Sequence, residues 1–223
     1  MTDAGKEAAG RAAADLVESG MRLGLGTGST VAHFLDALAA RGLDVAGVPT
    51  SEATAQRCRE LGIPLLDPAD VDRLDLCVDG ADELTRDLVL TKGGGGALLR
   101  EKVVAAMSDR MAVIATPDKV VPRLGATFPL PVEVVPFALA PVTRTLDDLG
   151  FHVQPRHGGA VCTDNGNAIL DCTAAEGILD PDVLDLELAR IPGIAEHGLF
   201  VDLASLALLG AEDGTVERLG EDW

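Results

Sequence analysis

A lysine, a run of four glycines and a glutamate stand close together near the middle of this sequence, and these residue types suit ligand chemistry. The run is Gly93–Gly96, directly after Lys92, and glycines let a backbone approach a ligand closely. Glu101 follows in the segment 97–107, where it shares one helical face with small and apolar residues. A carboxylate on such a face either points into a ligand cleft or is costly to bury. The alternative interpretation is a flexible turn followed by a solvated helix.

Two aspartates upstream add to these charged groups. Asp79 and Asp82 follow the apolar run 74–78, which is typical of a buried strand, and Lys92 follows the shorter apolar run 88–90. In open α/β sheets, ligands bind beyond the carboxyl ends of the strands. We therefore expect the two aspartates and the lysine at one ligand-binding rim.

The four charged side chains suit proton abstraction next to a carbonyl group. A carboxylate base takes the carbon-bound proton, a cation or hydrogen-bond donor stabilises the enediolate, and a second acid moves protons between oxygens. At neutral pH such a base benefits from a pKa raised by burial and by nearby carboxylates. Acidic pairs also bind Mg²⁺, but no histidine joins this cluster and Lys92 already supplies positive charge, so a metal site is the less favoured interpretation.

A second glycine loop, at 24–30, lies between a predicted strand and a predicted helix. Backbone amides at a helix start, with the hydroxyls of Thr27, Ser29 and Thr30, form a site for a phosphate. Ser29 stands where a dinucleotide fingerprint needs glycine and where a Walker A loop needs lysine, so neither motif is present. The alternative is a tight turn capped by Ser29 or Thr30, without a ligand.

The charge balance excludes several classes of partner. With a formal net charge of -18, the chain lacks the Lys and Arg patches that hold a nucleic acid, and an anionic membrane surface is excluded for the same reason. Lysine is rare and occurs only at Lys6, Lys92, Lys102 and Lys119. Because acidic, lysine-poor surfaces are typical of proteins dissolved in high salt, a halophilic source is a hypothesis.

No stretch of the sequence indicates membrane insertion or export. Apolar runs are too short for a membrane span, and the first residues lack the basic and then apolar order of a signal peptide. The cysteines, Cys58, Cys77, Cys162 and Cys172, form no CxxC pair and are expected to be reduced core residues. The sequence therefore predicts a soluble, cytoplasmic protein.

The order of predicted elements indicates the fold. Helices are expected at 3–19, 31–40, 51–61, 97–107, 141–149 and 181–191, and strands at 21–25, 45–48, 63–66, 74–78, 88–90, 111–115, 131–135, 151–154, 160–163, 168–172, 194–201, 203–209 and 215–219. Early strands and helices alternate as in a parallel α/β sheet, whereas the later order βαββαβ, with a hairpin around Asn165-Gly166, is ferredoxin-like. We predict an α/β fold, with a Rossmann-like, mostly parallel sheet domain at 1–129 and 201–223 and an inserted ferredoxin-like α+β domain at 130–200.

Three motifs, in order, resemble the type A ribose-5-phosphate isomerase family. They are Gly26-Thr27-Gly28-Ser29-Thr30, Asp79-Gly80-Ala81-Asp82-Glu83, and Lys92-Gly93-Gly94-Gly95-Gly96 with Arg100-Glu101-Lys102. Stretches at 128–134, 163–167 and 198–200 support the resemblance, which covers essentially the whole chain. It implies interconversion of D-ribose 5-phosphate and D-ribulose 5-phosphate in the non-oxidative pentose phosphate pathway, by a homodimer or homotetramer without a metal or organic cofactor.

The resemblance also implies roles for single residues. Glu101 matches the family's proton acceptor, Asp79 and Asp82 match the aspartates that handle ring opening and hydroxyl protons, and Lys92 matches a substrate-binding lysine. The other implied substrate-binding residues are Lys6, Thr27, Gly28, Ser29, Thr30, Gly80, Ala81, Gly93, Gly94, Gly95 and Lys119. Lys6, Lys92 and Lys119 would then surround an anionic sugar phosphate, while Lys102 pairs on the surface.

Two other classes of function share parts of this pattern. A sugar-phosphate sensor without activity could use the phosphate loop, but it would not need Glu101 and would normally carry a DNA-binding segment. A coenzyme A transferase could use a glutamate nucleophile, but Lys92 and the aspartate pair would then be unexplained.

Overall fold

The computed structural model describes residues 3–220, and the chain divides into two compact units. Unit 1 comprises Met1–Ala81, Arg100–Val120 and Asp202–Trp223, and unit 2 comprises Asp82–Leu99 and Val121–Val201. The predicted limits, 1–129 with 201–223 and 130–200, differ in that 82–99, 121–129 and Val201 belong to unit 2. The reason is strand pairing within unit 2, described below. Residues 1–2 and 221–223 of the predicted first domain lie outside the described residues.

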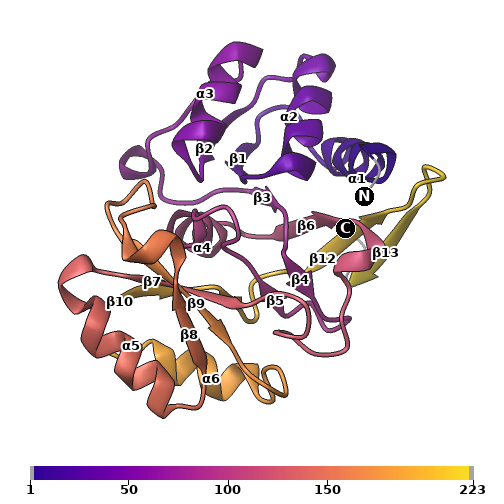
Figure 1. Ribbon diagram of the computed structural model, residues 1–223. Coiled ribbons are helices and arrows are strands. Elements are labelled where there is room, and N and C mark those ends of the chain that lie inside the picture. Colours follow the sequence, from indigo (N-terminus) through magenta and orange to yellow (C-terminus); the bar gives the residue numbers. More distant parts are fainter. Residues whose placement is uncertain (1–2, 221–223) are drawn as a thin grey trace. The chain divides into compact units, whose positions relative to one another are not determined.

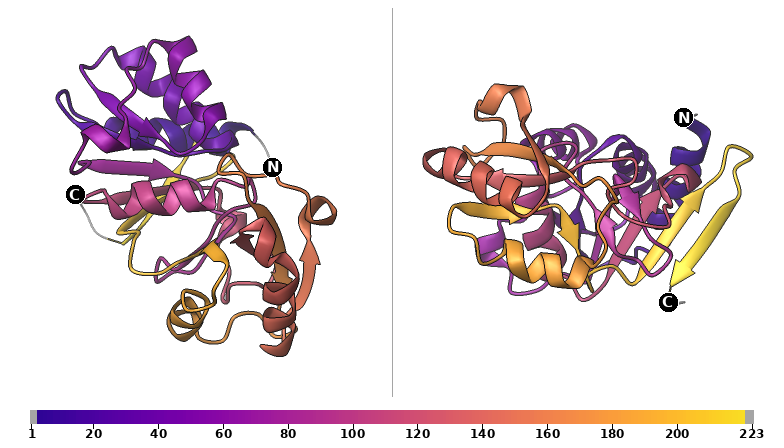
Figure 2. Two further views of the ribbon diagram at one scale, coloured as in Figure 1. Left: turned by 90° about the vertical axis from the view of Figure 1, so that its left-hand side faces the viewer. Right: turned by 60° about the horizontal axis from the view of Figure 1, so that its bottom comes forward.

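Unit 1 is built on a six-stranded sheet with the order β13-β12-β6-β3-β1-β2 (Figure 1). Neighbouring strands are parallel except at the β12–β13 hairpin, the yellow pair in Figure 2. The strands are β1 (Arg22–Leu25), β2 (Ala46–Pro49), β3 (Leu76–Asp79), β6 (Met111–Ala115), β12 (Leu206–Gly210) and β13 (Val216–Gly220). The prediction of a mostly parallel sheet with a returning hairpin is therefore confirmed.

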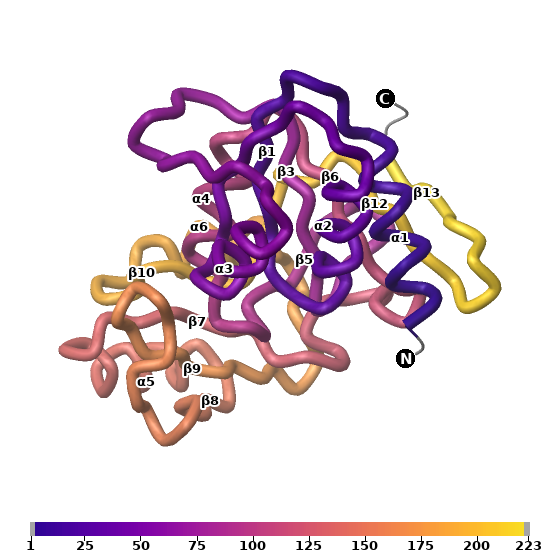
Figure 3. Tube along the Cα trace, turned by 90° about the horizontal axis from the view of Figure 1, so that it is seen from above, coloured from indigo at the N-terminus to yellow at the C-terminus, as the bar shows by residue number. Residues whose placement is uncertain are grey.

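The helices described with unit 1 are α1 (Asp3–Asp15), α2 (Ser29–Arg41), α3 (Glu52–Leu61) and α4 (Leu98–Ala106), with short 3-10 turns η1 (Pro68–Asp70) and η2 (Pro117–Lys119). Local sequence signals mark the ends of α2 and α3 among these helices. The hydroxyl of Ser51 caps α3, and Gly42 and Gly62 end α2 and α3 in left-handed conformations. α1 ends at Asp15, earlier than predicted, and packs against α2 (Figure 3). Among the described helices, none has the length and apolar composition to cross a membrane.

Unit 2 contains a four-stranded antiparallel sheet with the order β10-β7-β9-β8. Its elements are β7 (Leu130–Val134), η3 (Pro136–Ala138), α5 (Leu139–Asp148), β8 (His152–Pro155), η4 (Arg156–Gly159), β9 (Ala168–Thr173), α6 (Pro181–Leu188) and β10 (Ile194–His197). Val142 and Leu146 of α5 and Leu188 of α6 share one core with Val132 of β7 and Leu170 of β9. Both helices therefore cover the same face of the sheet, as the predicted βαββαβ order of a ferredoxin-like unit requires.

A second, three-stranded sheet explains why 82–99 belongs to unit 2. Its order is β11-β5-β4, with β4 at Glu83–Leu84, β5 at Leu90–Thr91 and β11 at Leu199–Phe200, all antiparallel. The predicted strand 194–201 is divided at Gly198, whose N–H donates to Pro131 and whose carbonyl accepts from the Lys92 amide. One half pairs with β7 and the other with β5.

Two predicted strands are wrong. Residues 63–66 form only an isolated bridge, between Leu65 and Gly47. Residues 160–163 form no strand, because the N–H groups of Cys162 and Thr163 both donate to the carbonyl of Asn167, which closes a compact turn. β9 pairs instead with β7 and β8.

Most cysteines lie in the core, as predicted. Cys58, Cys77 and Cys172 are buried, whereas Cys162 is half-buried. Burial raises the pKa of the Cys58 thiol to about 11 and that of the Cys172 thiol to about 12, so both thiols stay protonated at neutral pH.

Candidate functional site

Asp79 ends β3, between β1 and β6 in the sheet of unit 1. Its side chain is fully buried, and its Oδ1 accepts the backbone N–H of Thr27 at 3.1 Å and that of Gly80 at 2.7 Å. A Cβ at Gly26 would clash with this carboxylate, so the close approach requires glycine there. Asp79 therefore fixes the start of the phosphate loop, 26–30, from the adjoining strand.

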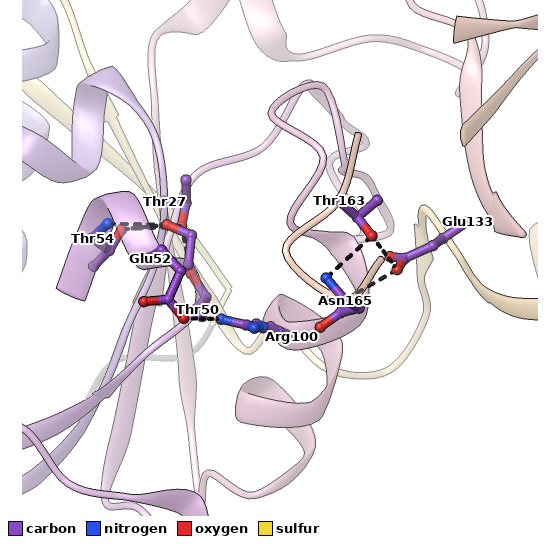
Figure 4. A network of polar contacts seen from close by, with 9 residues as sticks. Thr27, Thr50, Glu52, Thr54, Arg100, Glu133, Thr163 and Asn165 are labelled. Carbon is purple, nitrogen blue, oxygen red and sulfur yellow. Dashed lines mark hydrogen bonds and ion pairs between the residues drawn. The ribbon is translucent and has the colours of Figure 1, made fainter. Parts of the chain in front are cut away.

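A cluster of hydroxyl groups holds the same loop from the other side (Figure 4). The Thr27 Oγ1 lies 2.7 Å from the Thr50 Oγ1, 2.8 Å from the Ser51 Oγ and 3.1 Å from the Thr54 Oγ1. Thr54 also donates to the carbonyl of Gly26 at 2.8 Å. The Thr27 hydroxyl thus binds the loop to the start of α3. Sequence reasoning missed Thr50, Ser51 and Thr54, since short polar residues after a strand usually indicate only a cap.

The start of α2 offers backbone donors. Its N-cap is Gly28, with φ of 128°, and no side-chain hydrogen bond caps this end. The alternative of a turn capped by Ser29 or Thr30 is therefore not observed. Uncapped first-turn amides bind anions, and the Lys6 Nζ donates to the Ser29 Oγ at 2.9 Å, which brings a cation to the same place.

Glu101 lies in the first turn of α4, and only 5% of it is exposed. The carbonyl of Met107, at the far end of α4, accepts the N–H of Leu74 just before β3. α4 therefore runs antiparallel to β3, and its first turn lies toward the strand end that carries Asp79. The structure thus places both carboxylates on the carboxyl side of the sheet in unit 1.

Neighbouring elements complete this side of unit 1. The Arg100 Nη1 lies 2.9 Å from the Glu52 Oε1, an ion pair that ties the start of α4 to the start of α3 (Figure 4). Lys119 ends η2, which follows β6, the strand beside β3, and it is half-buried. Gly80 and Ala81 continue the chain from Asp79 and are also half-buried.

Asp82 and Lys92 are neighbours in unit 2. The N–H of Asp82 donates to the carbonyl of Thr91 at 2.9 Å, where β4 and β5 pair. Lys92 is 2% exposed, and its Nζ lies 5.4 Å from the centre of the Phe200 ring, so a cation–π contact stabilises the buried ammonium group. A strand pair therefore fixes this cation and this carboxylate close together.

The glycine loop, 93–96, follows Lys92 and adopts a conformation that only glycine takes easily. Gly93 and Gly96 have φ of 106° and 78°, and a Cβ at Gly94 would meet the Asp82 carboxylate. The N–H of Gly94 donates to the Asp82 Oδ2 at 2.7 Å. On its carbonyl side, the loop is held by Arg156, a residue that sequence reasoning missed because it lies 63 positions away from Gly93.

Glu83, the last residue of the acidic motif, supports the framework of unit 2. It is fully buried, and its carboxylate accepts the N–H groups of Gly125 (2.6 Å), Thr127 (2.6 Å) and Phe128 (3.0 Å), as well as the Thr127 hydroxyl at 2.6 Å. With four donors around it, this carboxylate anchors the segment that leads into β7.

A second buried glutamate, Glu133 on β7, organises the turn 163–167. Its Oε1 accepts from the Thr163 hydroxyl at 2.9 Å and from the side-chain amides of Asn165 and Asn167 at 3.0 and 2.9 Å (Figure 4). A Cβ at Gly96 would lie 3.5 Å from the carbonyl of Cys162, so this turn lies beside the glycine loop. Sequence reasoning found the turn but not the carboxylate that holds it.

The predicted site residues therefore fall into two groups. Unit 1 gathers the phosphate loop with Lys6, Asp79 with Gly80 and Ala81, Glu101 and Lys119, and unit 2 gathers Asp82, Lys92 and Gly93–Gly95. Within residues 3–220, no group of three or more His, Cys, Asp or Glu side chains is placed to hold a metal ion. The first group offers carboxylates for proton transfer and donors for an anion. The second offers a cation and backbone amides.

Comparison with known proteins identifies similar chains along almost the whole length. The family described as ribose 5-phosphate isomerase A (phosphoriboisomerase A) matches residues 46–214. A protein of Parvibaculum lavamentivorans named ribose-5-phosphate isomerase A is 48% identical over 222 residues, which cover 94% of this chain and 95% of the relative.

Two solved structures resemble this fold closely. Ribose 5-phosphate isomerase A of Methanocaldococcus jannaschii has a TM-score of 0.91 and 38% identity, over 97% of this chain and 98% of that one. A D-ribose-5-phosphate isomerase in complex with phospho-erythronic acid has a TM-score of 0.92 and 36% identity, over 97% of each chain.

Proposed function

We propose a mechanism from one premise: this chain belongs to the ribose 5-phosphate isomerase A family. It is an aldose–ketose isomerase that interconverts D-ribose 5-phosphate and D-ribulose 5-phosphate, a step of the non-oxidative pentose phosphate pathway. The proposal concerns which residues bind the sugar phosphate and which move its protons.

The phosphate group binds at the start of α2 in this proposal. The first-turn amides after Gly28 donate to its oxygens, because a helix start carries unpaired N–H groups and a partial positive charge. Lys6 and Lys119 add full positive charges, and the contact between Lys6 and the Ser29 hydroxyl supports the first of these assignments. In this proposal Thr27 contributes by holding the loop, because its hydroxyl contacts those of Thr50 and Ser51.

Asp79 and Asp82 handle the protons on oxygen. The sugar ring opens when a proton leaves the anomeric hydroxyl and another reaches the ring oxygen, so a carboxylate and its conjugate acid suffice. Asp79 is held by two backbone N–H groups on its Oδ1, and Asp82 by one on its Oδ2. These bonds fix the direction in which each carboxyl group presents its other oxygen.

Glu101 transfers the proton on carbon. Its carboxylate takes the C2 proton of the open-chain aldose, which gives an enediolate, and returns a proton to C1 while the hydrogen on O2 moves to O1. The ammonium of Lys92 and the amides of the glycine loop stabilise the negative oxygen of the enediolate. The observation that carries this assignment is the buried position of Glu101 in the first turn of α4, on the side of unit 1 that holds Asp79.

One assay tests the function directly. Purified protein is incubated with ribose 5-phosphate in the presence of EDTA, and ribulose 5-phosphate is measured over time. We expect steady conversion that EDTA does not slow, because every step above uses side chains and backbone groups. No conversion, or conversion that EDTA abolishes and Mg²⁺ restores, would contradict the proposal.

We also propose that the chain works in the cytoplasm as a homodimer or homotetramer. Phe137 is 96% exposed, and Leu179 and Leu186 are 67% and 57% exposed, all on unit 2. Exposed apolar side chains of this size are typical of surfaces that another chain covers. Light scattering after size-exclusion chromatography would give the mass, and a monomer at enzyme concentrations used in assays would contradict the oligomer.

A further inference from the structure

Arg156 places all of its guanidinium nitrogens on three residues of unit 2: Asp171, Gly93 and Gly94. Its Nε donates to the Asp171 Oδ2 at 2.9 Å and its Nη2 to the Asp171 Oδ1 at 2.5 Å, while its Nη1 donates to the carbonyls of Gly93 at 3.0 Å and Gly94 at 3.2 Å. The two charged side chains are 15% and 23% exposed. A bidentate, largely buried pair of this kind is rigid, so Asp171 on β9 fixes the direction from which Arg156 reaches the glycine loop.

The two carbonyls determine where the loop's N–H groups point. In a trans peptide unit the C=O and the N–H point in opposite directions. With the Gly93 carbonyl on Arg156, the N–H of Gly94 must point away from it, and it does, toward the Asp82 Oδ2 at 2.7 Å. With the Gly94 carbonyl on Arg156, the N–H of Gly95 also points away, and Gly95 is exposed.

Glycine side chains place no restraint on these peptide planes. A chain of glycines rotates freely in φ and ψ, so the direction of each amide must be fixed by a partner. On the carbonyl side, Arg156 donates to both carbonyls, and the Gly93 carbonyl also accepts from the Gly96 N–H at 3.0 Å.

We infer that Arg156, supported by Asp171, is a positioning residue: it holds the Gly94 amide on the Asp82 carboxylate and turns the amide of Gly95 toward the sugar phosphate and its enediolate. The inference rests on the proposed role of the glycine loop in substrate binding. Arg156 itself does not touch the substrate in this account. It acts by holding donors in place before the substrate arrives, which spares the reorganisation that weak, mobile donors would need.

The test compares two inhibitors on Arg156→Ala. Phospho-erythronic acid, which a solved relative binds, carries an anionic group where an enediolate would develop charge, whereas inorganic phosphate probes the phosphate loop alone. We expect the inhibition constant of phospho-erythronic acid to rise on the order of 10-fold to 100-fold and kcat/KM to fall on the order of 10²-fold, as when an oxyanion donor is lost. Inhibition by inorganic phosphate should stay within about twofold, a change too small to reflect loss of a donor.

Three further variants make the result specific. Arg123→Ala is the matched control, since its Nη1 donates to the Glu176 carbonyl at 2.9 Å in the same unit. Arg156→Lys keeps the charge but not the planar fork, so it should recover little activity, whereas added ethylguanidinium should partly restore Arg156→Ala. Asp171→Asn weakens the ion pair with Arg156, so its loss of kcat/KM should be smaller than that of Arg156→Ala. If Arg156→Ala does not fold, the two inhibitors are compared on Asp171→Asn instead.

Equal weakening of both inhibitors, an unchanged constant for phospho-erythronic acid, or full recovery in Arg156→Lys would overturn the inference. Isomerisation by the unsubstituted protein tests the proposed function separately from the role of Arg156. If that protein converts ribose 5-phosphate while the variants behave like it, the function stands and only the role of Arg156 fails.

Discussion

The two glycine loops of this protein are held in place by different kinds of chemistry. In unit 1, the loop 26–30 is surrounded by neutral hydroxyls from the start of α3, together with the buried carboxylate of Asp79. In unit 2, the loop 93–96 is held by two charged groups, the Arg156 guanidinium on its carbonyls and the Asp82 carboxylate on an amide. The loop 26–30 is therefore held mainly by several neutral hydrogen bonds, whereas the loop 93–96 is held by a few charge-assisted hydrogen bonds.

This difference leads to different expectations for substitution. A neutral hydrogen bond contributes about 1 kcal/mol, and a network with several members tolerates the loss of one. A charge-assisted bond is roughly twice as strong, and the loss of one partner leaves the other charge without compensation. The proposed division of labour adds a second contrast, because unit 1 holds the base that acts on carbon and unit 2 holds the cation that stabilises the product of that step.

The largest effect is expected in unit 1, for Glu101→Gln. The amide keeps the size of the side chain but cannot accept the proton, so kcat should fall on the order of 10² to 10⁴ while KM changes little. Steady-state kinetics with ribose 5-phosphate measure both. The control is Glu52→Gln, which also removes a carboxylate near the start of α4 but lies outside the proposed chemistry. A loss confined to KM would assign Glu101 to binding.

A smaller but broader effect is expected in unit 2, for Lys92→Met. The ammonium lies beside both the substrate and the enediolate in our proposal, so KM should rise and kcat should fall together, with kcat lower on the order of 10²-fold. Lys102→Met, which removes a half-buried lysine outside the proposed site, is the matched control. Kinetic constants in Lys92→Met equal to those of the unsubstituted protein would make Lys92 a structural residue, buried against Phe200 for stability alone.

The neutral network of unit 1 should lose less when one member is removed. Thr54→Val deletes the hydroxyl that donates to the Gly26 carbonyl and contacts Thr27 and Ser51. We expect a loss of about 1–3 kcal/mol in the free energy of unfolding, seen as a fall in Tm of roughly 2–10 °C, and a fall in kcat/KM of less than about tenfold.

Thr145→Val, at an exposed hydroxyl of α5, is the control for Thr54→Val and should change neither quantity. A loss of activity in Thr54→Val as large as that expected for Arg156→Ala would contradict the claim that the loop 26–30 tolerates the loss of one contact better than the loop 93–96.

Salt concentration should affect the contribution of surface charge to stability but not the contribution of the Arg156–Asp171 pair to activity. The net charge of -18 creates self-repulsion that ions screen, so Tm should rise from low to molar KCl. The Arg156–Asp171 pair is largely buried and is screened far less, so the ratio of kcat/KM between the unsubstituted protein and Arg156→Ala should not depend on salt. A flat or falling melting curve would contradict the hypothesis of a halophilic source.

Local patterns in the sequence predicted most of this fold. The strand, loop and helix around 22–41 and the capped helix at 52–61 follow from alternation, from Ser51 and from the glycines that end each helix. The predicted strand 160–163 failed because turn and strand compete over few residues, and the carboxylate of Glu133 holds the turn from another strand.

Most predicted residues of the site were also local, since all except Lys6 and Lys119 lie in three short motifs. What remained hidden was the set of side chains that hold those motifs. Arg156 and Asp171 come from η4 and β9, far along the chain from the glycine loop, and one arginine among others carries no local signal. Thr50 and Thr54 looked like ordinary residues at a helix start, and only the fold brings their hydroxyls to Thr27.

The central claim is that Glu101 moves a proton between carbon atoms by way of an enediolate. The most direct measurement follows the C2 proton of ribose 5-phosphate by NMR in deuterated solvent with EDTA, for the unsubstituted protein and for Glu101→Gln. Our account predicts that the unsubstituted protein exchanges this proton for deuterium as it isomerises, and that exchange and isomerisation fall in parallel in the variant, on the order of 10² to 10⁴. Exchange by Glu101→Gln at the unsubstituted rate would contradict the account and place the base elsewhere.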